Sequence, residues 1–315
     1  MRSHVPGLAN PRMPRRGAAL GAALGLALGL FGVAPQVALT ASGPVLHWLQ
    51  PAQAGTAAAV DAAQVAALGD AMQLGPLLAV IREEGLAYGD GLDKAMLAGS
   101  GGVNWRAEVA RIYDPASVRP QLDSAMLKTL ADDPVTLQAM QDFFASPLGT
   151  RVAGLEVQAR RAFLDPSAKD AATLAWLEMD EKTTPRAATL HRLIDQMDLI
   201  ELNVQGTLNA NLALYHGLVQ GGGLKVPMTD EGAAAQVAGG EAQARASAQA
   251  WLYPFMALAY QPLSDAELDG YVAFLASESG KKANLAMFHA FDALFADISH
   301  DLGLAVSHQM AGSNI

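Results

Sequence analysis

Apolar residues recur at steps of three or four near the end of the chain. This spacing places them on one face of an α-helix, which has about 3.6 residues per turn. Packing against a protein core is the ordinary role of such a stripe, and we expect that role here rather than a cofactor or partner groove. The stripe consists of Leu285, Phe288, Phe291, Phe295, Ile298, Leu302 and Val306.

Pairs of a capping residue and a proline divide the middle of the chain into segments of helical length. An Asp, Ser or Thr side chain accepts hydrogen bonds from the N–H groups of a first helical turn, and proline at the next position has no N–H to leave unpaired. Ser264 with Glu267 adds a capping-box pattern before a later segment. Helices are therefore predicted to begin at Asp114-Pro115, Asp133-Pro134, Ser146-Pro147, Asp165-Pro166 and Thr184-Pro185.

The remaining helices are predicted from periodicity and from glycine-containing breaks. Gly75-Pro76 is expected to separate the first two helices of the chain, and Gly221 to follow the end of the longest predicted helix. No segment alternates with period two, so the predicted fold is all-α: a multi-helix array of antiparallel helical hairpins. These further helices are Val60–Met72, Pro76–Leu97, a segment from Trp105 to Tyr113, and one long helix over Arg186–Leu218.

A soft boundary is predicted near residue 225, where glycines are followed by an Ala- and Gly-rich stretch. It separates an N-terminal helical region, 55–224, from a C-terminal helical region, 225–315. One continuous domain over residues 55–308 is the alternative. Residues 229–241 are expected to form a connector or a weak helix.

The first 54 residues contain four arginines and no acidic residue, which is typical of an export signal. The uncharged run Gly17–Val33 is shorter than the roughly 20 residues of a membrane span. We therefore expect residues 1–54 to be a signal peptide and disordered leader, of the general secretory rather than the twin-arginine type, cleaved after Ala54 or, as the alternative, near Ala41. The mature protein would then be periplasmic or secreted. An uncleaved segment anchored in the inner membrane is the alternative, favoured by a second apolar stretch, Val37–Leu49.

Composition narrows the classes of function. Hydrophobic residues make up 51% and charged residues 17% of 315, which is typical of a globular chain with a sizeable core. The absence of Cys excludes disulfides, thiolate metal sites and thiol nucleophiles. A formal net charge of −10 repels phosphate backbones, so we do not expect nucleic acid as a partner.

Two segments that lie 131 residues apart resemble each other. Phe143–Gly149 aligns with Phe274–Gly280, and each contains a serine, Ser146 or Ser277, followed three positions later by glycine. We expect each serine to cap a helix and each glycine to permit close approach of the neighbouring helix. Neither serine lies in a nucleophile elbow, so both roles are structural. The alignment predicts an internal duplication of one helical hairpin.

This F-x-S-x-x-G hairpin resembles the hallmark of the bacterial family called domain of unknown function 2059 (DUF2059). The resemblance covers roughly residues 60–305 and implies an exported, helical protein. The family has no established activity, so the resemblance implies no catalytic residue. The chain departs from the family's frequent Phe-Tyr pair, with Phe143-Phe144 and Phe274-Leu275 in its place. Further similar stretches are Arg82–Gly89, Leu155–Arg161 and Asn209–Leu218.

Few polar residues are candidates for chemistry. His191 with Asp195, and His289 with Asp292, have helical spacing but not the pattern of a metal site, so neither a metal nor a cofactor is predicted. The sequence also contains neither a phosphate-binding glycine-rich motif nor a dinucleotide fingerprint.

Several carboxylates and amides have helical spacing. The adjacent acids Glu83 and Glu84 are expected on a solvated helix face or in a pair with an arginine. Glu156 and Arg160 are predicted to pair at i, i+4, as a structural ion pair if they lie between hairpins. Asparagine is a poor helix former, so the asparagines of the long helix suggest interhelical hydrogen bonds or a polar pocket. The candidate pocket residues are Asn203, Asn209, Asn211, Tyr215, Glu84 and Tyr88.

These patterns favour a non-enzymatic interaction or binding protein of the cell envelope, whose partner is another protein or an apolar ligand. Helical hairpins pack one face against each other and leave another face for a partner. One alternative is an envelope hydrolase that brings His191, His216 or His289 to a Ser and a carboxylate. The other is membrane contact, through the last helix or an uncleaved N-terminal segment.

Overall fold

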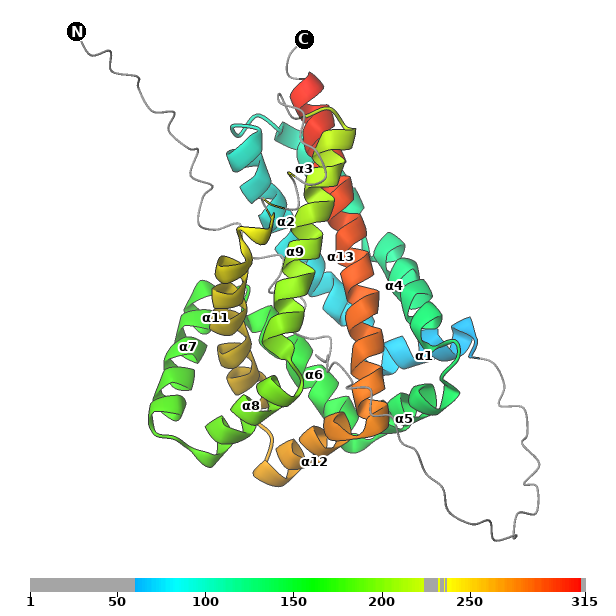
Figure 1. Ribbon diagram of the computed structural model, residues 1–315, viewed down its shortest axis with the longest axis vertical. Helices are drawn as coiled ribbons and strands as arrows, with labels where there is room; N and C mark the ends of the chain where they lie inside the picture. Colours follow the sequence, from blue (N-terminus) through cyan, green and yellow to red (C-terminus); the bar gives the residue numbers. More distant parts are fainter. Residues whose placement is uncertain (1–59, 224–231, 233–234, 236, 313–315) are drawn as a thin grey trace, which may run out of the picture.

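The computed structural model describes residues 60–223, 232, 235 and 237–312 (Figure 1). The described residues form helices and the turns between them, with no strand among them, so the predicted all-α class is confirmed. The predicted signal peptide and part of the predicted connector, residues 229–231, 233–234 and 236, lie outside the described residues. The helices are α1 (Ala62–Ala71), α2 (Leu74–Met96), α3 (Gly102–Ile112), α4 (Pro115–Leu130), α5 (Pro134–Ala145), α6 (Pro147–Ala162), α7 (Pro166–Glu181), α8 (Pro185–Gln196), α9 (Leu199–Gln220), α11 (Glu241–Tyr260), α12 (Asp265–Ala276) and α13 (Glu278–Gly312).

The capping prediction is confirmed at every predicted position. Each of the five Asp, Ser or Thr residues accepts a hydrogen bond from a backbone N–H of the first turn, and proline follows it directly. Ser264 and Glu267 form the predicted reciprocal capping box at α12. Most of the apolar stripe of α13 is buried, as predicted.

Two predicted helix boundaries are wrong. The long helix over Arg186–Leu218 is divided into α8 and α9 at Asp198, which has a left-handed backbone with φ 51°. The break buries the apolar residues on both of its sides, Met197 and Leu199. The other break, between α1 and α2, falls at Gln73, also left-handed. Gly75-Pro76 lies instead in the first turn of α2, where proline interrupts no hydrogen bond.

The long helices α9 and α13 run side by side in the same direction (Figure 1). They approach closely where Gly217 of α9 and Gly303 of α13 meet the opposite backbone. A Cβ on Gly217 would lie 2.1 Å from the carbonyl oxygen of His300, and one on Gly303 would lie 2.2 Å from that of Leu214. Only glycine permits this spacing.

The two similar segments form hairpins of matching design, α5–α6 and α12–α13. Ser146 accepts a hydrogen bond from Gly149 N at 3.1 Å, and Ser277 accepts one from Gly280 N at 3.0 Å. A Cβ on either glycine would lie 2.0 Å from the carbonyl oxygen of the phenylalanine six residues earlier. The predicted structural roles of both serines and both glycines are therefore confirmed.

The two hairpins pack against each other through equivalent residues. The rings of Phe143 and Phe274, which occupy the same position in each hairpin, stack with centroids 3.8 Å apart. Lys282 of α13 pairs with the cap of α5, Asp133, at 3.2 Å. In return, Arg151 of α6 contacts Glu267 in the first turn of α12. These reciprocal contacts relate the hairpins by an approximate two-fold axis.

A single hydrophobic core joins residues from both sides of the predicted boundary near residue 225. Helix α13 packs against α4, α5 and α9, while α11 packs against α6, α7 and α9. Helices α7 and α8 lie at one side of the molecule and α4 at the other (Figure 1).

Candidate functional site

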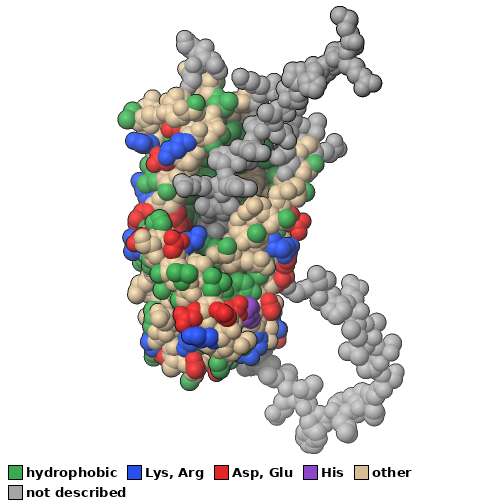
Figure 2. Space-filling view, turned by 90° about the vertical axis from the view of Figure 1, so that its left-hand side faces the viewer, with side chains coloured by type: hydrophobic (Ala, Val, Ile, Leu, Met, Phe, Trp, Pro, Cys, Tyr) green, Lys and Arg blue, Asp and Glu red, His purple; other side chains and the backbone are tan. Residues whose placement is uncertain are grey.

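Helix α7 presents leucines to the solvent. Leu174 and Leu177 are 69% and 54% exposed, although both are large and apolar. Ala171 and Ala175 are exposed beside them, and these four residues are called the α7 ridge below. Figure 2 views the molecule from this side and shows hydrophobic side chains gathered across the middle of the face, bordered by acidic ones.

The inner face of α7 is held by aromatic packing. Trp176 is buried and stacks on Tyr253 of α11, with ring centroids 4.8 Å apart. His191 of α8 lies edge-on to Trp176 at 5.2 Å. Because the inner face is already packed, the exposed leucines are not required to hold α7 in place.

His191 and Asp195, which have helical spacing in the sequence, do not bind each other; the contacts of His191 come from other helices. Its Nε2 atom lies 2.6 Å from Asp180 and its Nδ1 atom 3.3 Å from the hydroxyl of Tyr253. Neither partner is a serine, as a Ser-His-carboxylate hydrolase would need. His216 and His289 are exposed on α9 and α13. The three histidines therefore lie on three different helices.

A second polar feature is buried between the hairpins. The carboxyl of Glu156 on α6 accepts hydrogen bonds from Tyr260 of α11 at 2.7 Å and from Tyr271 of α12 at 3.1 Å. These three residues are called the buried acid centre. Burial raises the pKa of Glu156 to about 7, and the two hydrogen bonds oppose the shift. This carboxyl therefore changes charge near neutral pH.

The positions that match Glu156 and Tyr271 in the other hairpin are apolar. Met287 occupies in α13 the place that Glu156 has in α6, and Met140 of α5 corresponds to Tyr271. Both methionines are fully buried. The hairpin architecture therefore accepts an apolar side chain where the chain carries an acid. The two tyrosines were not candidates from the sequence, although the alignment, continued three residues toward the N-terminus, pairs Tyr271 with Met140.

The predicted pair between Glu156 and Arg160 is replaced by a longer-range one. Arg160, whose side chain is completely buried, donates to the carboxylate of Glu84 on α2 through Nε at 3.0 Å and Nη2 at 2.6 Å. Glu83 pairs with Arg161 at 2.9 Å. The expected arginine pairing of the two adjacent acids is therefore observed, with consecutive arginines of α6.

Tyrosines adjoin this ion pair. The ring of Tyr113 lies against Gly85, where a Cβ would be 2.5 Å from the ring carbons. Burial, reinforced by the negative charge of Glu84, raises the pKa of Tyr113 far above its usual value, and burial raises that of Tyr88 to about 12. Both phenols are therefore neutral at physiological pH.

The asparagines proposed for a pocket do not converge on one. Asn203 is buried and donates to the carbonyl of Leu199, one turn earlier in α9. Asn209 is exposed and donates to both carboxylate oxygens of Asp292 at 3.1 Å, so the expected interhelical hydrogen bond is formed there. Asn211 and Tyr215 are half-buried farther along α9.

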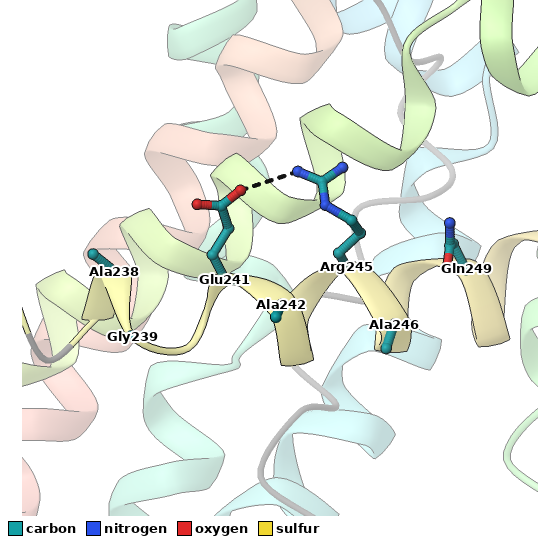
Figure 3. A pocket seen from close by; sticks show the side chains of 7 residues that line it. All are labelled: Ala238, Gly239, Glu241, Ala242, Arg245, Ala246 and Gln249. Carbon is teal, nitrogen blue, oxygen red and sulfur yellow. Dashed lines mark hydrogen bonds and ion pairs between the residues drawn. The ribbon is translucent and has the colours of Figure 1, made fainter.

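None of the six candidate pocket residues lines either of two hollows on the described surface. One, of about 380 Å³, lies between α2 and α3, with Arg106 and Asp90 3.4 Å apart at its lining. The other, of about 500 Å³, lies beside the start of α11, where Arg245 pairs with Glu241 (Figure 3). Its lining consists of Ala238, Gly239, Glu241, Ala242, Arg245, Ala246 and Gln249, mostly small side chains with few groups to orient a ligand.

Comparison with protein-family models, curated proteins and solved structures finds no match to this chain. The resemblance to DUF2059 therefore stays a prediction. Within the described residues, no group of three or more His, Asp or Glu side chains is arranged to hold a metal ion. In the same part of the chain, no single helix has the length and apolar character to cross a membrane; α1 and α2, bent by 71°, meet that test only as a pair.

Proposed function

We propose that this chain is a non-enzymatic interaction protein of the cell envelope, and that it binds a protein partner through the α7 ridge. The observation that supports this proposal is the exposure of Leu174 and Leu177 on a helix whose inner face is already packed. Burying a leucine side chain on binding is worth roughly 1.5–3 kcal/mol, so two neighbouring leucines would contribute to the affinity of an interface centred on them.

The chemistry around the α7 ridge indicates the kind of partner. The leucines are three residues apart, so they lie on one helix face and match the spacing by which helices bind apolar grooves. Asp170, Glu178 and Glu181 are exposed on the same helix. We therefore expect an apolar groove with a basic border. An anionic lipid surface would be repelled by these acids.

The envelope location rests on the sequence, through the arginine-containing, acid-free N-terminal segment. The non-enzymatic character is supported by the geometry of His191, whose contacts are a carboxylate and a phenol. The polar residues proposed for a pocket are also distributed over two helices rather than gathered around one cavity.

Site-specific photo-crosslinking in intact cells tests the proposal. A photoreactive residue is placed at Leu174 or Leu177, and at Val103 or Val135 as controls, because these valines are 79% and 71% exposed elsewhere on the surface. We expect a discrete protein adduct from the leucine positions and none from the valines. Equal adducts from all four positions, or adducts with lipid alone, would contradict a specific protein interface.

A further inference from the structure

We propose that Glu156 is a proton-operated latch: when protonated it holds α6 against the corner between α11 and α12, and when ionised it loosens that junction. The latch is separate from the α7 ridge and does not depend on the proposed function. It follows from which helices the carboxyl joins, which groups surround it, and what the equivalent position contains.

The carboxyl joins three helices through one atom. Oε1 of Glu156 accepts hydrogen bonds from both tyrosine hydroxyls, that of Tyr260 at the end of α11 and that of Tyr271 in the middle of α12. The rings of Tyr260 and Tyr271 also contact each other, with centroids 5.6 Å apart. Loss of the carboxyl's interactions therefore affects the contact between the first hairpin and the second.

The two groups that bind the carboxyl are neutral phenols. Tyr260 faces it from α11 and Tyr271 from α12, and burial keeps the pKa of each phenol well above its usual value. Phe143 of α5 stacks on Tyr271 with ring centroids 5.7 Å apart. On α6 itself the nearest cation along the helix is Arg160, which pairs with Glu84 of α2.

An ionised carboxylate in these surroundings has lost its hydration and gains two phenol hydrogen bonds in return. Burying a charge costs more free energy than two neutral hydrogen-bond donors restore. Burial is therefore the largest influence on the pKa of this carboxyl. Ionisation therefore favours conformations in which water reaches Glu156. Separation of α6 from the α11–α12 corner is one such conformation.

The second hairpin serves as an internal comparison. Met287, at the position equivalent to Glu156, is completely buried and cannot ionise. The hairpin fold therefore does not require a titratable group at that position. An acid in one hairpin and a thioether in the other give the molecule one junction that responds to pH and one that does not.

Amide hydrogen exchange of the full chain between about pH 5 and pH 8, corrected for the intrinsic pH dependence of exchange, tests the latch. If opening returns the carboxyl to its ordinary pKa of 4.5, the opening equilibrium of α12 should rise roughly 70-fold over this range. Glu156→Gln, which keeps the shape without the charge, should abolish the rise. Glu83→Gln, which removes the charge of an acid that is 50% exposed, should preserve the rise.

A wild-type opening equilibrium that stays constant with pH would overturn the proposal, as would an equal rise in Glu156→Gln. If that variant does not fold, a carbon-13 nuclear magnetic resonance titration of the glutamate carboxyls in the wild-type chain replaces it. A carboxyl that titrates near neutral pH together with the ring signals of Tyr260 and Tyr271 supports the latch. If no glutamate carboxyl titrates in this way, the latch is refuted.

Discussion

The two members of the buried ion pair differ in their access to water, so removing one or the other should have unequal effects. The side chain of Arg160 is 0% exposed, whereas that of Glu84 is 29% exposed. Glu84→Met leaves a guanidinium buried without its carboxylate, which should cost about 3–5 kcal/mol of the free energy of unfolding. Arg160→Met leaves a carboxylate that water can reach, so we expect about 1–2 kcal/mol.

The pair of variants should also be non-additive. In the double variant Glu84→Met/Arg160→Met no charge is left without a partner, so its cost should be well below the sum of the single costs. Urea unfolding followed by circular dichroism gives all four free energies, with unchanged slopes as the check on two-state behaviour. An Arg160 variant as damaged as the Glu84 variant, or strictly additive costs, would refute the reasoning from burial.

Three further changes test other parts of the structure. Gly217→Ala should lower the free energy of unfolding by about 1–3 kcal/mol because its Cβ overlaps the α13 backbone. Gly91→Ala, whose Cβ has no atom within 4 Å, should instead raise it by up to about 1 kcal/mol, and thermal unfolding measures both changes. Ser264→Ala removes a capping box and should cost about 1 kcal/mol in urea unfolding. Glu156 has a higher pKa in the folded than in the unfolded chain, so its contribution to stability is complete below about pH 4.5 and is lost as the pH rises through about 7. Wild type should therefore lose up to about 3 kcal/mol over that range, and Glu156→Gln should not show this loss.

The helix starts were predictable because capping is local. The side chain of Asp133 and the Thr136 N–H that it binds are three residues apart, so a short stretch of sequence is enough to predict the interaction. The break at Asp198 was not predictable in this way, because the apolar periodicity continues through Met197 and Leu199. Its left-handed backbone is compatible with Asp, but only the packing of both neighbours in the core requires the turn there.

The candidate sites were harder to predict than the fold. Glu84 and Tyr88 were selected from the sequence, but their significance depends on Arg160 and Tyr113, which come from other helices. The α7 ridge was not predicted, since a leucine on a helix pattern is expected to be buried. Exposure of Leu174 follows from what packs on the opposite face of α7, and that information is not local.

By itself, the sequence of this chain determined the all-α class, most helix starts, the buried stripe of α13 and the structural roles of Ser146 and Ser277. Hydrogen bonds and periodicity that span a few residues suffice for all of these. Tertiary structure alone decided that Glu156 meets Tyr260, 104 residues away, and that Arg160 pairs with Glu84, 76 residues earlier. The free energy of a buried charge depends on every group around it, and folding brings those groups together from distant segments.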